Sequence, residues 1–167
     1  MSAPYRVESL GGHDRAAFVS GQESLDRYIR QQATQDARRG MARVYVLVEV
    51  STGTVAGYDT LSNYAIEAAS LPSEITKRFG RYPSLPATLL GRLALDRRYQ
   101  ARKIGGVLLR NALRKALEVS EDIASCGVVV DAIDDAARGF YEHHGFVRFL
   151  DNAYKLFIAM ETVRKLP

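Results

Sequence analysis

The stretch Ala87-Thr-Leu-Leu-Gly-Arg-Leu-Ala-Leu-Asp-Arg-Arg-Tyr-Gln-Ala-Arg-Lys-Ile-Gly-Gly106 decides the fold. Its first nine residues are almost all apolar, which predicts a strand over 87–95 that is buried on both faces. A polar turn over 96–103 follows it. Residues 104–119 then carry a broad apolar stripe at helical spacing, which predicts a helix. The stretch therefore predicts a buried strand that leads through a polar turn into a helix.

Further elements are expected on both sides of this unit. The pattern of apolar and β-branched residues predicts strands over 5–10, 43–50, 55–66, 127–130, 146–150 and 154–160. Helical spacing predicts a helix over 22–39 and a short one around 73–79. A third helix begins after Asp134 as N-cap and runs to His144, where Gly145 supplies the left-handed residue. This order predicts one mixed α/β domain spanning residues 1–167, with helices on both faces of the sheet.

The composition excludes several classes of protein. The chain has 167 residues, of which 47% are hydrophobic, and this is enough for one sizeable core. No apolar run approaches the roughly 20 residues that span a bilayer, and the N-terminus lacks an apolar signal core. One cysteine and three histidines without metal-ligand spacing predict no metal site. We therefore expect a cytoplasmic protein without a membrane partner.

Positive charge is concentrated in one part of the chain. Between Ile75 and Leu117 there are eleven basic residues and one acid, Asp96, so this stretch carries +10 while the whole chain carries +4. Such a field attracts ligands that bear phosphate groups. The alternative is a solvated helix face, since basic clusters are common on soluble domains.

The turn between the strand and the helix is a candidate anion site. The first amides of a helix lack carbonyl partners, and the helix dipole adds partial positive charge at that end. A pyrophosphate satisfies both, and Gly105 and Gly106 allow its close approach. By itself, a double glycine at a helix start is more often a flexible turn or a packing contact.

A second segment lies one helix and one strand further along the chain. It reads Ala137-Arg-Gly-Phe-Tyr-Glu-His-His-Gly-Phe146, and the turn reads Gln100-Ala-Arg-Lys-Ile-Gly105. At this spacing the two segments resemble the GNAT acetyltransferases, which carry Gln/Arg-x-x-Gly-x-Gly/Ala after their fourth strand and Ala-x-x-Phe-Tyr-x-x-x-Gly-Phe after their fifth. The resemblance implies the GNAT fold, with a mixed sheet of about six to seven strands splayed at the cofactor strand.

The resemblance also implies a site for acetyl-CoA and a proton donor. Tyr141 would be the general acid that protonates the departing CoA thiolate. The sequence departs from the family at Lys103, where the family usually has its first glycine, and at Asp134, where many relatives have asparagine. The expected cofactor contacts are backbone groups of Leu93, Ala94 and Leu95 and the turn residues Gln100, Ala101, Arg102, Lys103, Ile104, Gly105 and Gly106.

Over nearly its whole length the chain resembles one subgroup, the acetyltransferase toxins of bacterial toxin–antitoxin pairs. Matching stretches include Gly80-Arg-Tyr-Pro, Leu90-Gly-Arg-Leu-Ala-Leu-Asp-Arg and Val130-Asp-Ala-Ile-Asp-Asp. The subgroup acetylates the amino acid on charged tRNA, pairs with a ribbon-helix-helix antitoxin and forms a homodimer. Basic residues expected to contact the tRNA are Lys77, Arg78, Arg81, Arg97 and Arg98.

No side chain stands out as a general base. This fits an α-amine acceptor, because an α-amino group titrates near 8 and is partly neutral at cellular pH, whereas a lysine amine titrates near about 10.4. Two alternatives stay open. One is a GNAT enzyme acting on a small amine or a protein N-terminus, and the other is a non-catalytic module that binds acetyl-CoA or nucleic acid.

Overall fold

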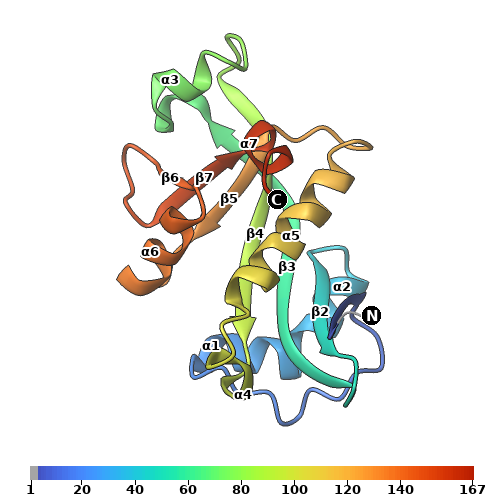
Figure 1. The fold of residues 1–167 in the computed structure, drawn as a ribbon. Helices are drawn as coiled ribbons and strands as arrows, with labels where there is room; N and C mark the ends of the chain where they lie inside the picture. Colours follow the sequence, from blue (N-terminus) through green and yellow to red (C-terminus); the bar gives the residue numbers. More distant parts are fainter. Residues whose placement is uncertain (1–3) are drawn as a thin grey trace. The chain divides into compact units, whose positions relative to one another are not determined.

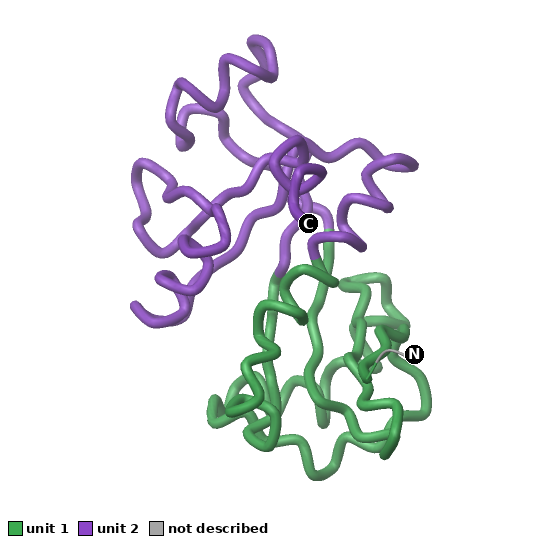
Figure 2. The backbone as a smooth tube through the Cα atoms, viewed as in Figure 1, with its two compact units in different colours: residues 1–62, 91–112 green, residues 63–90, 113–167 purple. Residues whose placement is uncertain are grey.

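The computed structural model describes residues 4–167, which form two compact units (Figure 2). Unit 1 comprises residues 1–62 and 91–112, and unit 2 comprises residues 63–90 and 113–167. Strands β3 (Thr54–Glu67) and β4 (Ser84–Leu95) and helix α5 (Gly105–Val119) each contribute residues to both units (Figure 1). That the chain acts as a single domain stays a prediction.

Unit 1 contains an antiparallel run of strands in the order β1-β2-β3-β4. Strand β1 (Tyr5–Ser9) pairs with β2 (Arg43–Glu49), and β2 pairs with β3 across the predicted hairpin. The register shifts between Leu47 and Val48, where a bulge interrupts the β2–β3 ladder. The predicted strands over 5–10, 43–50 and 55–66 are therefore confirmed with small changes at their ends.

The helix predicted over 22–39 forms in three consecutive segments. They are α1 (Glu23–Arg27), a π-helical turn η1 (Tyr28–Gln32) and α2 (Ala33–Arg38). The π turn buries Tyr28 and Ile29 in a core that also contains Phe18 and Tyr58. The Tyr58 hydroxyl donates a hydrogen bond of 2.6 Å to the Leu25 carbonyl oxygen, which fixes this helical stretch to β3.

Unit 2 contains strands in the order β3-β4-β5-β7-β6. Strand β5 (Gly127–Asp131) runs parallel to β4, whereas β7 (Lys155–Ala159) is antiparallel to both β5 and β6 (Val147–Arg148). Strand β6 is shorter than the predicted 146–150. The seven strands and the accompanying helices confirm the predicted mixed α/β fold.

Helix α6 (Asp135–His143) begins and ends as its sequence predicts. The Asp134 carboxylate accepts a hydrogen bond of 2.8 Å from the Ala137 amide, and Gly145 follows with φ of +99°. Helix α3 (Ser73–Thr76) is shorter than predicted, and a 3-10 turn, η2 (Ala68–Ser70), precedes it. The sequence pattern does not predict helix α7 (Met160–Arg164), because its first apolar residue continues the apolar pattern of the preceding strand.

Strand β4 corrects one prediction. The apolar run over 87–95 predicts burial on both faces, but Gly91 is exposed and Leu89 is only half-buried. Among the described residues, the parallel register with β5 runs from Thr88 to Leu90 and ends there. A strand whose neighbour stops pairing leaves part of its backbone uncovered, as the predicted splay at this strand requires.

Within residues 4–167, no helix combines the length and apolar composition that crossing a membrane requires.

Candidate active site

The segment that follows β4 is more ordered than a polar turn. A helical turn, α4 (Arg97–Gln100), begins directly after Asp96, which is 1% exposed. The Asp96 carboxylate accepts hydrogen bonds from the Arg98 amide at 2.9 Å and from the Val19 amide at 3.1 Å. Burial alone would raise the pKa of Asp96, but the hydrogen bonds from Arg98 and Val19 hold it below its usual value. Asp96 therefore anchors the start of the turn as an ionised N-cap.

The Gln100 side chain closes the other end of α4. Its amide nitrogen donates to the carbonyl oxygen of Leu95 at 2.9 Å and to that of Ser20 at 2.7 Å. These bonds join the turn, the last residue of β4 and the segment before α1, all within unit 1. The Gln100 side chain thus holds the predicted cofactor turn in shape, and its amide is already occupied by protein carbonyls.

Lys103 explains why the family places a glycine at this position. Its φ is +56°, and it is the one non-glycine residue with positive φ within residues 4–167. A left-handed backbone costs a residue with a Cβ atom about 1–2 kcal/mol, whereas glycine adopts it without that cost. The exposed Lys103 therefore bears a backbone strain that the family's usual glycine would not.

Arg102 is paired within the protein. Its guanidinium donates to the Glu49 carboxylate at 2.7 Å and lies 4.6 Å from the centre of the Tyr99 ring. The Tyr99 hydroxyl donates to the same carboxylate at 2.8 Å. Hydrogen bonds from Tyr99 and Arg102 lower the pKa of Glu49. The Arg102 side chain therefore ties the turn to the β2–β3 hairpin, while its backbone forms part of the turn.

Helix α5 starts at the two glycines. Ile104 is buried, and its carbonyl accepts the Leu108 amide at 3.0 Å, so the helical ladder begins there. The amides of Gly105 and Gly106 stand in the first turn, where helix geometry leaves N–H groups without carbonyl partners. Small side chains and a positive dipole end fit a pyrophosphate at this point. The exposed Ala101 adds no obstructing side chain.

The end of β4 packs closely against β3 in unit 1. A Cβ atom at Gly57 would lie 2.9 Å from the Ala94 carbonyl oxygen, so only glycine permits this approach. Ala94 is buried, while Leu93 and Leu95 are half-buried. These are the three residues whose backbone is expected to pair with the pantetheine arm.

Tyr141 lies in the last turn of α6, in unit 2. It is 7% exposed, and its ring packs edge-on against Phe140 and Phe146 at centroid distances of 5.5 and 5.3 Å. Its carbonyl oxygen accepts the amides of His144 and Phe146, which ends the helix. Both the aromatic packing and the helix end hold the phenol in one orientation.

The predicted RNA-contacting residues are all exposed and occur in both units. Lys77, Arg78 and Arg81 follow α3 in unit 2. In unit 1, Arg98 pairs with Asp96 at 2.9 Å, and Arg97 lies over Gly21. A sixth basic residue, Arg92, lies 3.6 Å from the centre of the Tyr28 ring, so this cation belongs to the packing of unit 1.

Sequence reasoning missed the residues that support the turn. The sequence pattern assigns neither Asp96 nor Glu49 to the site, although an aspartate just before a helical turn is a recognisable N-cap signal. Within residues 4–167, no group of three or more histidine, cysteine, aspartate or glutamate side chains is arranged to hold a metal ion.

Comparison with known proteins establishes the class. The family model for the acetyltransferase (GNAT) domain matches residues 40–148. A tRNA-acetylating toxin of Mycobacterium tuberculosis (strain ATCC 25618 / H37Rv) is 32% identical over 165 residues, covering 99% of this chain and 96% of that protein. The chain belongs to the GNAT acetyltransferase family. It is an N-acetyltransferase, and acetyl-CoA is its acetyl donor.

Two solved structures are similar over nearly their whole length. A tyrosine-to-phenylalanine mutant of KacT has a TM-score of 0.91 and 26% identity, covering 99% of this chain and 100% of that chain. AtaT complexed with acetyl-methionyl-tRNAfMet has a TM-score of 0.88 and 27% identity, covering 96% of this chain and 97% of that chain. The GNAT fold predicted from the sequence is thereby confirmed.

Proposed function

We propose that this enzyme is a toxin that acetylates the α-amino group of aminoacyl-tRNA and so blocks translation. The observation that carries the proposal is the 32% identity to a tRNA-acetylating toxin over 99% of this chain and 96% of that protein. Similarity in fold to AtaT in complex with acetyl-methionyl-tRNAfMet supports the same acceptor.

The chain's own residues suggest how the donor would be held. The amides at the start of α5 would bind the pyrophosphate, with the turn kept in shape by Asp96, Gln100 and Arg102. Backbone groups of residues 93–95 would pair with the pantetheine arm. A backbone amide near Leu95 would face the thioester oxygen and stabilise the negative charge that develops on it.

Transfer then needs one bond made and one broken. The acceptor nitrogen attacks the thioester carbonyl carbon, the carbon–sulfur bond breaks, and the thiolate takes a proton from the Tyr141 hydroxyl. The amine loses one proton to solvent, and the Tyr141 phenolate takes one proton back from solvent, which restores the acid. A phenol with a pKa of about 10 can protonate a thiolate whose conjugate thiol has a pKa of about 8.5 when transfer is concerted with bond cleavage.

The acceptor tRNA would contact the exposed basic residues. Lys77, Arg78 and Arg81 would follow the RNA backbone, together with Arg97 and Arg98. Phosphate contacts of this kind release counterions, so binding should weaken steeply as salt rises.

The assembly and location of the protein are part of the same proposal. As a member of the toxin subgroup, it would act as a homodimer in the cytoplasm and be neutralised by a ribbon-helix-helix antitoxin. The chain would function as one catalytic domain. Size-exclusion chromatography with light scattering tests the homodimer, and co-expression with the protein encoded by the neighbouring reading frame tests the antitoxin.

One assay tests the acceptor directly. The protein is incubated with labelled acetyl-CoA and a pool of charged tRNA, with uncharged tRNA as control. Label on the charged pool alone supports the proposal. Label on free amines or peptide N-termini but not on aminoacyl-tRNA would replace it with the first alternative, and cofactor binding without any transfer would replace it with a non-catalytic module.

A further inference from the structure

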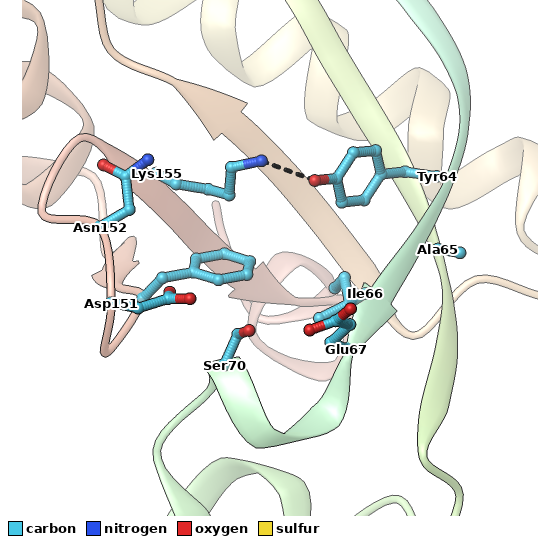
Figure 3. Close-up of a pocket in the computed structure, with 9 residues that line it drawn as sticks. Tyr64, Ala65, Ile66, Glu67, Ser70, Asp151, Asn152 and Lys155 are labelled. Atoms are coloured by element: carbon cyan, nitrogen blue, oxygen red, sulfur yellow. Dashed lines mark hydrogen bonds between the residues drawn. The ribbon is translucent and has the colours of Figure 1, made fainter.

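Unit 2 contains a cavity that is lined by none of the residues predicted to take part in acetyl transfer. Its volume is about 390 Å³, and the buried residues Ile66 and Phe149 are among those that line it. Figure 3 shows Ile66 with the other labelled lining residues. Clefts of roughly 300–1,000 Å³ are typical of small-ligand sites. The cavity is large enough for a planar ring with part of its attached sugar.

The cavity lies at the end of the β4–β5 pairing. Lys155, which lines it, is paired with Asp131 across β5 and β7. The neighbouring β5 residue, Val130, is the partner of Leu90, where the β4–β5 register ends. The cavity therefore stands at the level of the sheet where the β4–β5 pairing ends.

One wall of the cavity offers a cation with hydrogen atoms to donate. The Lys155 ammonium donates to the Tyr64 hydroxyl at 2.6 Å, and it lies 3.7 Å from an Asp131 carboxylate oxygen. Its hydrogen bond to Tyr64 raises the pKa of Lys155, so the ammonium stays charged. An ammonium has three N–H groups, and Tyr64 takes one of them. Donors remain for an acceptor atom of a ligand.

The opposite wall offers acceptors. Figure 3 shows Glu67, Ser70 and Asp151 across the cavity from Lys155 and Tyr64. Glu67 and Asp151 are exposed, and neither carboxylate forms an ion pair or a side-chain hydrogen bond within residues 4–167. Two carboxylates against one ammonium disfavour a phosphate inside the cavity. They suit a group that donates hydrogen bonds.

We propose that this cavity binds an unpaired amino-bearing nucleobase, cytosine or adenine, at the 3′ end of the acceptor tRNA. The exocyclic amine would donate to Asp151 or Glu67, and a ring acceptor would take a hydrogen bond from Lys155. The aromatic rings of Tyr64 and Phe149 supply the apolar contacts that single-stranded bases use on proteins. Uracil fits poorly, because it presents a carbonyl oxygen where cytosine presents its amine.

This assignment rests on the proposed aminoacyl-tRNA function. All mature tRNAs end in the unpaired sequence CCA, so a cavity for cytosine or adenine would serve every acceptor. The flanking phosphates would remain outside the acidic wall of the cavity.

Binding of short RNA tests the cavity without requiring catalysis. Fluorescently labelled trinucleotides CCA and UUU carry equal charge, so the ratio of their dissociation constants isolates recognition of the bases. We expect the protein to bind CCA about 5- to 100-fold more tightly than UUU at fixed salt. Equal affinity for the two trinucleotides overturns the proposal.

Variants of the lining residues test which side chains recognise the nucleobase. In Glu67→Ala/Asp151→Ala, two acidic charges are lost, which by itself strengthens RNA binding in general, yet the preference for CCA should fall at least fivefold. Lys155→Met should reduce it similarly. The matched control is Glu161→Ala, an exposed carboxylate on α7 outside the cavity, which should keep the wild-type ratio. An unchanged ratio in the double variant overturns the assignment even if Lys155→Met does not fold.

The outcome is separable from that of the proposed function. If aminoacyl-tRNA is acetylated but CCA and UUU bind equally, the cavity assignment fails and the function stands. If CCA is preferred through Glu67 and Asp151 but no aminoacyl-tRNA is acetylated, the cavity is a nucleobase site and the proposed reaction fails.

Discussion

Replacing Lys103 with glycine should stabilise the protein. Lys103 has a φ of +56°, a conformation that costs a residue with a Cβ atom about 1–2 kcal/mol. Glycine removes this strain but adds about 0.5–1 kcal/mol of unfolded-state entropy. The expected net gain in the free energy of unfolding is about 0.5–1 kcal/mol. For a chain of this length, that raises the melting temperature by about 1–4 °C.

Lys103→Ala is the matched control, because alanine also lacks the ammonium but keeps the Cβ atom. Urea unfolding should show Lys103→Gly to be more stable than wild type, and Lys103→Ala to be no more stable than wild type. If the alanine and glycine variants gain equally, the effect comes from removing positive charge, and the reasoning from the backbone is refuted.

Both variants also report on the cofactor. If the Lys103 ammonium contacts phosphate, both should bind acetyl-CoA more weakly by calorimetry, and the deficit should shrink as salt rises. If the side chain points away from the phosphates, Lys103→Gly should bind acetyl-CoA at least as tightly as wild type, since the turn then keeps its shape with less strain.

Three further outcomes are expected. Tyr141→Phe should lower kcat by about 10²- to 10⁴-fold with little change in acetyl-CoA affinity, and a change of only a few-fold would remove Tyr141 from the acid role. Gln100→Leu removes the bonds to Leu95 and Ser20, so the KM for acetyl-CoA should rise by about tenfold, whereas unchanged kinetics would show that the turn keeps its shape without the amide. Asp59 is 3% exposed, its Oδ1 has no hydrogen-bond partner within residues 4–167, and burial raises its pKa to about 8. Because the unfolded chain releases this proton near pH 4, the free energy of unfolding should fall as pH rises from about 4 to 8, by at most about 6 kcal/mol. Asp59→Asn should lack this decline in denaturant titrations at several pH values, and an equal slope in both proteins would show that other groups cause it.

Local pattern was enough for the elements that carry the cofactor turn. The apolar run over 87–95 and the apolar stripe over 104–119 are patterns formed by residues close together in the sequence. A strand and a helix can therefore be predicted from them without knowledge of the tertiary structure. The cap at Asp134 and the left-handed Gly145 are equally local, and both ends of α6 follow from them. The paired motifs around the turn and Tyr141 indicate acetyl transfer from the amino-acid sequence alone.

Exposure and partner choice depended on the tertiary structure. No pattern in 87–95 reveals that β5 stops pairing at Leu90, so the prediction that β4 is buried on both faces is wrong. Gln100 bonds to Ser20, 80 positions away, and Arg102 bonds to Glu49, 53 positions away. Lys155 meets Tyr64 across 91 positions.

The physical reason is one of range. Periodicity, capping and turn chemistry act over a few residues, so the amino-acid sequence by itself determined the strand–turn–helix unit, the capped helix that carries Tyr141 and the acetyltransferase class. Hydrogen bonds and ion pairs between distant segments form only where folding brings those segments together. For this reason, only the tertiary structure decided that Arg102 serves the turn instead of standing free, and that Lys155 and Tyr64 form one wall of a cavity.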